Sequence, residues 1–195
     1  MRMPPLPTPA PIDAPGRVVG NRPAHVTKPI AISPYDPDWP GRFRREQARI
    51  RAALGTTALA IDHVGSTAVP GLAAKDRVDI DLIVADPADE DTYVPALTEA
   101  GYRLATREPH WYEHRCLWNA GHDVNLHVFG PDCDEHLRHL ILRDWLRAHP
   151  EDRDRYEAGK REAAAANPMS MSGYVAGKAG VILDILRRAG LRPGK

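Results

Sequence analysis

The sequence predicts an α+β fold in which a mixed β-sheet comes first and a group of helices follows. Two observations carry the prediction. Between residues 59 and 129, short apolar stretches alternate with polar residues, which is the period of half-buried strands. From residue 134 onward, apolar residues recur every three or four positions, which is the period of amphipathic helices. A chain of 195 residues is long enough to form one domain with a substantial core.

A helix is expected to begin the folded part of the chain. Asp38 can cap its N-terminus, Pro40 suits its first turn, and Gly55 is typical of the position just after a helix. Side chains at helical spacing give this helix one apolar face, formed by Trp39, Phe43, Ile50 and Leu54.

The sheet and the later helices follow in order along the chain. Strands are expected at residues 59–64, 78–84, 102–106, 110–117 and 124–129. Between the second and the third of them, a helix is expected to start at Asp86 and to end at Ala100. The C-terminal helices should cap the sheet, and they are expected from residue 134 to Pro150, at 152–167 and at 172–189.

The first part of the chain has a different composition. Residues 1–29 contain eight of the nineteen prolines and few aliphatic side chains. Such a segment buries too little apolar surface to offset the entropy lost on ordering, so it is predicted to be a disordered leader. The alternative is an arm that lies across another surface. The folded domain is expected to span residues 30–191.

Bulk properties exclude several classes of protein. The formal net charge is zero and no long basic run occurs, which argues against nucleic-acid binding. No apolar stretch approaches the roughly 20 residues that a bilayer requires, and the N-terminus lacks the layout of a secretory signal. Cys116 and Cys133 are interpreted as free thiols in a reducing compartment. We therefore expect a cytoplasmic protein without nucleic-acid or membrane partners.

One expected strand carries two carboxylates. Because successive side chains of a strand point to opposite faces, Asp79 and Asp81 share one face and their apolar neighbours share the other. Two adjacent carboxylates repel each other unless a cation lies between them. Mg²⁺ typically takes one or two carboxylates and completes its shell with substrate phosphates and water. Asp79 and Asp81 are therefore predicted to bind a metal.

A Gly-Ser turn lies upstream of the two carboxylates. Gly65 and Ser66 offer free backbone N–H groups and a hydroxyl, which are typical ligands of phosphate oxygens. Thr67 either shares that role or caps the next turn. The alternative is that these residues form a turn and nothing more.

These motifs resemble those of known families. A Gly-Ser turn followed, after twelve residues, by Asp-x-Asp on a strand resembles the signature of the nucleotidyltransferase (polymerase-beta-like) superfamily. The longer string DHVGSTAVPGLAAK, from Asp62 to Lys75, resembles the hallmark of the GrpB-like family of predicted nucleotidyltransferases. The similarity continues through YDPDWP at 35–40, RDWLRAHP at 143–150, and Tyr156 with Lys160.

The resemblance implies a fold and a chemistry. The fold would be a nucleotidyltransferase-like mixed sheet with flanking helices. The activity would be Mg²⁺- or Mn²⁺-dependent transfer of a nucleoside monophosphate from a nucleoside triphosphate, with ATP favoured, to a small-molecule acceptor. A variant would adenylate a carboxylate. Similar domains occur fused to dephospho-CoA kinase, so a nucleotide-binding or accessory module without transfer activity remains an alternative.

The superfamily usually adds a third carboxylate from a neighbouring strand, and this sequence departs from that pattern. The polar face of the expected strand holds Asp123, Asn125 and His127. Asp123 lies at the turn end of the strand, and neutral His127 could serve as a base or as a ligand. The alternative is the ordinary polar surface of a strand.

Two of the expected cap helices contain Tyr-x-x-x-Lys. Tyr156 with Lys160, and Tyr174 with Lys178, place an ammonium one turn from an aromatic ring. The resemblance implies that the two lysines contact the triphosphate. The residues alone fit equally a lysine stem that covers a tyrosine and keeps its charge in water.

Residues 110–114 spell H-x-x-E-H, a zinc-protease pattern that requires a helix. Pro109 and the later glycine turn favour a strand here, so metalloprotease chemistry is not expected. On a strand, His110, Tyr112 and His114 would line one face.

Overall fold

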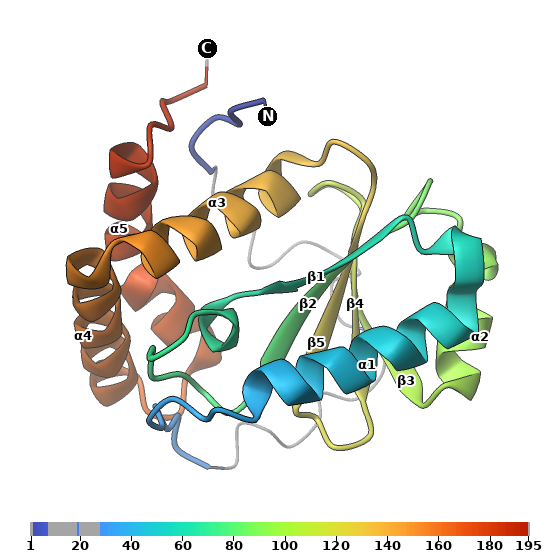
Figure 1. Ribbon diagram of the computed structural model, residues 1–195, viewed down its shortest axis with the longest axis horizontal. Coiled ribbons are helices and arrows are strands. Elements are labelled where there is room, and N and C mark those ends of the chain that lie inside the picture. The colour runs from blue at the N-terminus through green and yellow to red at the C-terminus, as the bar shows by residue number, and fades with distance from the viewer. Residues whose placement is uncertain (1, 8–18, 20–27, 195) are drawn as a thin grey trace.

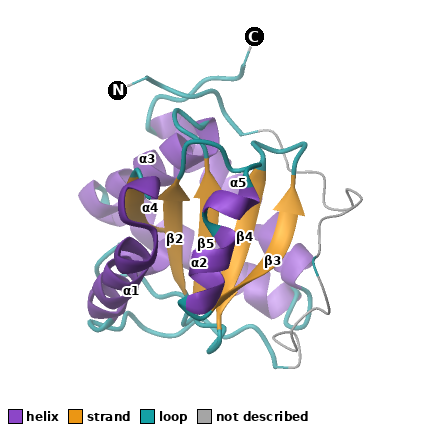
Figure 2. Cartoon of the chain, turned by 90° about the vertical axis from the view of Figure 1, so that its right-hand side faces the viewer, coloured by secondary structure: helices purple, strands orange, loops and turns teal. Residues whose placement is uncertain are grey.

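The computed structural model describes residues 2–7, 19 and 28–194. These residues form a five-stranded sheet, and Figure 2 shows four of its strands side by side. β2 and β5 are parallel, whereas the other neighbouring pairs are antiparallel, so the predicted mixed sheet is confirmed. In sheet order the strands are β1 (Ala60–Val64), β2 (Val78–Ile83), β5 (Val124–Phe129), β4 (His114–Asn119) and β3 (Tyr102–Glu108).

Helices cover both faces of the sheet (Figure 1). On one face lie α1 (Trp39–Leu54) and α2 (Val94–Glu99), and on the other lies α3 (Asp134–Ala148). α4 (Pro150–Ala166) and α5 (Met171–Arg188) pack against each other and against α3. This group of three helices is the C-terminal cap that the change in periodicity predicts.

The apolar face of β2 holds the sheet against α1. Val78, Ile80 and Leu82 are fully buried in one cluster with the apolar side of β5 and with Ile50 of α1. Burial of a side chain of this size contributes about 1.5–3 kcal/mol. Because strand side chains alternate, the same packing directs Asp79 to the opposite face, beneath α3.

Residues 110–113 do not form the strand that the sequence suggests. They form a turn in which Tyr112 and Glu113 have φ angles of 57° and 49°, and β4 begins only at His114. Positive φ angles interrupt a strand and a right-handed helix alike. The prediction of a strand from His110 with alternate residues on one face is therefore wrong. The residues of the H-x-x-E-H pattern do not form a helix either, so they lack the geometry of a zinc-protease site.

The single helix expected from Asp86 to Ala100 is also wrong. Two short elements replace it, a 3₁₀ turn (Glu90–Thr92) and α2. The Asp86 carboxylate accepts a hydrogen bond from the Ala88 N–H at 2.8 Å, which favours a local turn over a helix. Pro95 lies in the first turn of α2, where a missing N–H costs least.

Part of the proline-rich leader makes defined contacts. Arg2 binds Asp134 of α3, and the Leu6 N–H donates to the Arg192 carbonyl at 2.8 Å. Arg138 of α3 donates to the Pro5 carbonyl at 2.8 Å. Residues 2–7 thus have partners on α3 and on the C-terminal segment that composition cannot reveal, and the disorder of the leader stays a prediction. Residues 1, 8–18 and 20–27 lie outside the described part of the chain.

Two bulk predictions concern membranes and cysteines. Within the described ranges, no helix combines the length and the apolar character needed to cross a bilayer. Cys116 and Cys133 are both free and buried, as expected. The cytoplasmic location stays a prediction.

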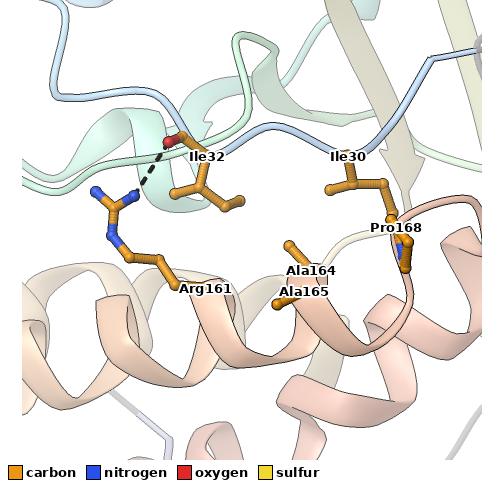
Figure 3. A pocket seen from close by; sticks show the side chains of 6 residues that line it. All are labelled: Ile30, Ile32, Arg161, Ala164, Ala165 and Pro168. Carbon is orange, nitrogen blue, oxygen red and sulfur yellow. Dashed lines mark hydrogen bonds between the residues drawn. The ribbon is translucent and has the colours of Figure 1, made fainter.

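A hollow of 320 Å³ lies between residues 30–32 and α4 (Figure 3). The Arg161 guanidinium donates to the Ile32 carbonyl at 3.2 Å and to the Glu157 carboxylate at 2.8 Å, so the charged group of this lining is already bonded. The hollow offers no acid, base or nucleophile for chemistry. Its lining consists of Ile30, Ile32, Arg161, Ala164, Ala165 and Pro168.

Candidate functional site at the polar face of β2 and β5

The predicted carboxylates and the predicted histidine come together on one sheet face. In the parallel pairing of β2 with β5, Asp79 lies beside Asn125 and Asp81 lies beside His127. Register partners point to the same face, so these four side chains form one polar patch beneath α3. Asp62 of β1 pairs with Asp81 and extends the patch.

Asp79 is held between β5 and the Gly-Ser turn. Its Oδ1 accepts a hydrogen bond from Asn125 Nδ2 at 2.7 Å and lies 3.9 Å from His127 Nε2. Burial works to raise the pKa of Asp79, but His127 and Asn125 outweigh it and lower that pKa to about 2. A Cβ atom on Gly65 would lie 2.5 Å from Asp79 Oδ2. Only glycine therefore allows this approach, and Gly65 has a φ of 69° as well.

Asp81 is fully buried and has two histidine partners. His136 Nδ1 and His139 Nδ1 each lie 2.9 Å from Asp81 Oδ2. Burial works to raise the pKa of Asp81, but His139 and His136 hold that pKa below its ordinary value. The other oxygen, Oδ1, is buried without a hydrogen-bond partner among the residues described. An unpaired carboxylate oxygen in a protein interior is costly, so it marks a place where a cation would be stabilised.

The two α3 histidines were not identified from the sequence. His136 and His139 are three residues apart and therefore lie on the same face of α3. Their other nitrogens point to further carboxylates, because His136 Nε2 lies 3.7 Å from Asp62 and His139 Nε2 lies 3.5 Å from Glu135. Burial lowers the pKa of His139, but Asp81 and Glu135 raise it to about 10. The sequence feature that could have identified both residues is their H-x-x-H spacing on an expected helix.

The Gly-Ser turn is fixed from the side of α3. Arg143 donates to the His63 carbonyl at 3.0 Å, and Arg147 donates to the Ala68 carbonyl at 2.8 Å. Ser66 and Thr67 begin a single 3₁₀ turn (Ser66–Ala68), and the first N–H groups of such a turn have no partner within it. Thr67 is buried, and its hydroxyl lies 3.0 Å from His63 Nε2. The Thr67 side chain therefore braces the turn.

The predicted lysines occupy different environments. Lys178 is half-buried with its ammonium 5.3 Å from the centre of the Tyr174 ring. Burial lowers the pKa of Lys178, but Tyr156, Tyr174 and Asp79 raise it above its ordinary value. Lys160 is fully buried, and its ammonium donates to the Ala73 carbonyl.

A further lysine, which was not among the predicted site residues, lies beside Lys178. The Lys75 ammonium is 5.1 Å from the centre of the same Tyr174 ring and 3.4 Å from Met171 Sδ. Burial lowers the pKa of Lys75 to about 8, and nearby Asp79 works in the opposite direction. Two cations thus flank Tyr174 within electrostatic reach of Asp79. The sequence feature that could have identified Lys75 is its position between the Gly-Ser turn and the Asp-x-Asp motif.

Asp123 is placed apart from the polar patch. Its Oδ1 accepts a hydrogen bond from Asn119 at 2.6 Å, and its Oδ2 lies 3.5 Å from Arg42 of α1. Of the two residues considered for the third position, the structure brings His127 to Asp79, whereas Asp123 binds Asn119 and Arg42.

The donor set suits a divalent cation that brings some of its own ligands. The described residues contain no group of three or more histidine, cysteine or acidic side chains arranged to hold a metal. Asp79 and the unpaired Oδ1 of Asp81 nevertheless provide hard oxygen donors on one face. Mg²⁺ commonly binds through one or two carboxylates together with substrate phosphates. The site therefore fits Mg²⁺ or Mn²⁺ that arrives with a phosphate ligand.

Comparison with known proteins decides the family. Residues 29–188 match the GrpB protein family. The chain belongs to the GrpB family. A UPF0157 protein of Halalkalibacterium halodurans is 48% identical over 160 residues, which is 82% of both chains. The crystal structure of a conserved GrpB protein from Enterococcus faecalis superposes with a TM-score of 0.70 at 27% identity, and the match covers 81% of this chain and 98% of that one.

One GrpB relative is a longer protein. A dephospho-CoA kinase of Mycolicibacterium paratuberculosis is 35% identical over 187 residues. The alignment covers 83% of this chain but 46% of that protein. The GrpB-like part therefore makes up about half of that relative.

Proposed function

We propose that this GrpB protein transfers a nucleoside monophosphate from a nucleoside triphosphate to a small-molecule acceptor. One observation carries the proposal. Asp79 contacts the Gly-Ser turn and lies within electrostatic reach of two lysines, and it shares its strand face with the buried Asp81, one oxygen of which has no partner among the described residues. Carboxylates next to phosphate-binding groups are what a complex of metal and triphosphate requires.

The residues divide into three groups by role. Asp79 and Asp81 would hold Mg²⁺ or Mn²⁺, which when bound neutralises charge on phosphate oxygens during in-line displacement. Backbone N–H groups of the turn at Gly65 and Ser66 would bind the outer phosphates. Lys75 and Lys178 add positive charge on the same side, whereas Lys160 is bound to the Ala73 carbonyl.

His127 is the group placed to take the proton of the acceptor, in the form that carries no proton on Nε2. Burial works to lower the pKa of His127, but Cys116 and Asp79 raise it well above its ordinary value, so this form requires a pH above that raised pKa. Its Nε2 faces Asp79, and it is the base nearest to that carboxylate among the predicted residues. As the acceptor oxygen bonds to the α-phosphorus, the bond from that phosphorus to the bridging oxygen breaks. Pyrophosphate leaves with the electron pair, and the acceptor proton passes to His127 Nε2.

A second candidate is a nucleotide-binding accessory module without transfer. Two observations favour it: Asp81 Oδ2 is already bonded to two histidines, and the described residues hold no third carboxylate at the metal position. A GrpB-like half within a dephospho-CoA kinase is compatible with such a role.

The test is to incubate the protein with Mg²⁺, each nucleoside triphosphate in turn and a metabolite extract, and to measure pyrophosphate release. Transfer predicts release that depends on the extract and disappears in Asp79→Asn. Triphosphate binding in calorimetry without release, from an extract proven active with another transferase, would support the accessory module. Absence of both would contradict the nucleotide proposals.

Calorimetry with lysine variants maps the phosphate contacts. Lys75→Met and Lys178→Met should each weaken triphosphate binding about tenfold or more, since a charge-assisted hydrogen bond is worth roughly 1.5–3 kcal/mol. Monophosphate binding should change less, because the lost contacts lie on the outer phosphates. Lys160→Met is the matched control, and equal losses for all three lysines would contradict the assignment.

A further inference from the structure

Arg77 is a half-buried cation directly before β2 that has no acidic partner in the described part of the chain. Its Nη1 donates to Asn125 Oδ1 at 3.3 Å, which places the guanidinium on the sheet face that carries Asp79. The neighbouring Asp76 binds Arg42 of α1 at 2.8 Å instead. A guanidinium keeps its charge at any physiological pH and has five N–H donors, so most donors of Arg77 are available to a ligand.

Asn125 connects Arg77 to the candidate metal site. Its side-chain oxygen accepts from Arg77 at 3.3 Å, and its side-chain nitrogen donates to Asp79 Oδ1 at 2.7 Å. The two partners use opposite ends of one amide, because arginine only donates hydrogen bonds and a carboxylate accepts them. One nitrogen of the guanidinium is thus anchored beside the site, while the remaining N–H groups can face a ligand.

The Gly-Ser turn and Arg77 lie on opposite sides of Asp79. Gly65 directly follows β1, and a Cβ atom on Gly65 would lie 2.5 Å from Asp79 Oδ2. The other oxygen, Oδ1, is turned toward β5, where Asn125 holds both Asp79 and Arg77. In the sheet, β1 and β5 flank β2 on its two sides. The positive charge of Arg77 is therefore offered on the β5 side of the carboxylate.

In-line displacement gives these two sides different roles. The attacking and leaving oxygens lie on opposite sides of the phosphorus in such a reaction. With the outer phosphates at the Gly-Ser turn, pyrophosphate leaves on the β1 side and the acceptor approaches on the β5 side. His127, the proposed proton acceptor, also belongs to β5. Arg77 is thus a cation on the side from which the acceptor approaches.

We propose that Arg77 binds a carboxylate or phosphate group of the acceptor, which makes the acceptor of this GrpB protein an anionic small molecule. The inference rests on the proposed function, because it names the class of substrate for the same site. The planar guanidinium matches two oxygens of either group, and such a paired contact fixes both the position and the orientation of a ligand. The group that Arg77 binds is separate from the acceptor oxygen that attacks the α-phosphorus.

Anion exchange of the metabolite extract tests the charge of the acceptor. The extract is divided into a fraction that the resin retains and a fraction that passes through, and each is assayed for pyrophosphate release with Mg²⁺ and triphosphate. We expect release with the retained fraction alone. Release with the unretained fraction would overturn the inference and leave the transfer function standing. Absence of release from both fractions and from the whole extract would contradict the transfer function, and binding then decides whether Arg77 holds an oxyanion.

Binding measurements need no turnover. The protein is saturated with Mg²⁺ and a triphosphate analogue that has a methylene group between the α- and β-phosphorus atoms. Inorganic phosphate or acetate is then titrated while the Nε–Hε signal of Arg77 is followed by NMR. We expect saturable binding that shifts this signal. Arg77→Gln should weaken it about tenfold or more, since the change removes the charge and the paired contact but keeps an amide donor for Asn125.

The triphosphate is the other possible source of an oxyanion at Arg77. Its affinity should be unchanged in Arg77→Gln, and a loss comparable to that for phosphate would assign Arg77 to the triphosphate and overturn the inference. The matched control is Arg44→Gln, an exposed arginine of α1 on the other face of the sheet, which should leave both affinities unchanged. An Arg77 signal in wild-type protein that responds to neither phosphate nor acetate would also overturn the inference. Binding at Arg77 without any pyrophosphate release would refute the transfer function and leave the oxyanion site standing.

Discussion

The two faces of β2 use the same strand for opposite purposes. On the α1 face, Ile80 and Leu82 are fully buried among apolar side chains. On the α3 face, Asp81 is equally buried but among histidines, and one of its oxygens has no hydrogen-bond partner in the described part of the chain. Burial of the apolar side chains on the first face is favourable in itself. Burial of a carboxylate on the second face costs desolvation free energy, which oppositely charged or hydrogen-bonding partners must offset.

The comparison shows which face of the sheet contributes most to the free energy of unfolding. The apolar face supplies stability and sets the strand register. The polar face uses part of that stability to hold the Asp81 carboxylate away from bulk water, whereas the Asp79 side chain stays about a third exposed. Substitutions on the two faces should therefore have different signatures, and the following experiments test this in order of decreasing effect.

Leu82→Ala should produce the largest loss of stability. Truncation of a fully buried leucine removes transfer free energy and leaves a cavity, so the free energy of unfolding should fall by about 2–5 kcal/mol. Denaturant titration measures this change. Nucleotide affinity of the folded fraction should stay unchanged, and a loss below 1 kcal/mol would mean that this face is not the main source of stability.

Asp81→Asn should cost less stability but should abolish nucleotide binding. His136 and His139 both donate to Oδ2 of Asp81, and replacing the carboxylate by an amide removes the negative charge that strengthens these two hydrogen bonds, so we expect a loss of about 1–3 kcal/mol. Asp79→Asn is the control, because Asn125 can still donate to the amide oxygen. Denaturation and calorimetry of both variants check the pair. Greater stability in Asp81→Asn would show that repulsion between carboxylates outweighs their histidine partners.

Lys160 should reveal the cost of burying charge among the cap helices. Burial and nearby Lys178 lower the pKa of Lys160 from 10.5 to about 7. Between these values the unfolded chain binds more protons, so stability should rise with pH by at most about 1.4 kcal/mol per pH unit. Urea titrations at pH 7, 8 and 9 measure the slope. Lys160→Met should lack this component, and parallel pH profiles for the two proteins would contradict the shift.

Deletion of residues 1–7 should have the smallest effect. Leu6 packs partly against the cluster formed by Ile141, Leu186 and Leu191, so we expect a loss of about 1 kcal/mol. A thermal melt of the shortened protein checks this. The substitution Leu6→Ser within the full chain should reproduce most of the loss, and no change in either protein would show that these contacts do not stabilise α3.

The sequence predicted those parts of the site that depend on local periodicity. Alternation along β2 and β5 places Asp79, Asp81 and His127 on one face, and the Gly-Ser turn lies beside them. The α3 histidines were missed, because their partner Asp81 is 55 residues from His136 in sequence and helix docking is not a local property.

The contact between Glu108 and His114 and the turn at residues 110–113 were missed for a similar reason. Pairing of Glu108 with His114 depends on the register between β3 and β4, which a tight turn with positive φ angles sets. The aromatic composition of residues 110–113 alone suggests a longer strand there. Composition also concealed the contacts of residues 2–7, since proline content says nothing about a partner elsewhere in the fold.

The hydrogen bond from the Leu6 N–H to the Arg192 carbonyl has a consequence for protein engineering. It places the two ends of the described chain next to each other at the outer side of α3 (Figure 1). A short peptide linker could therefore join them, and new termini could be opened at the turn between β4 and β5, where Gly121 is exposed. Such a circular permutant would keep the order of all five strands in the sheet and would move the termini to the turn between β4 and β5, where a fluorescent reporter could be attached.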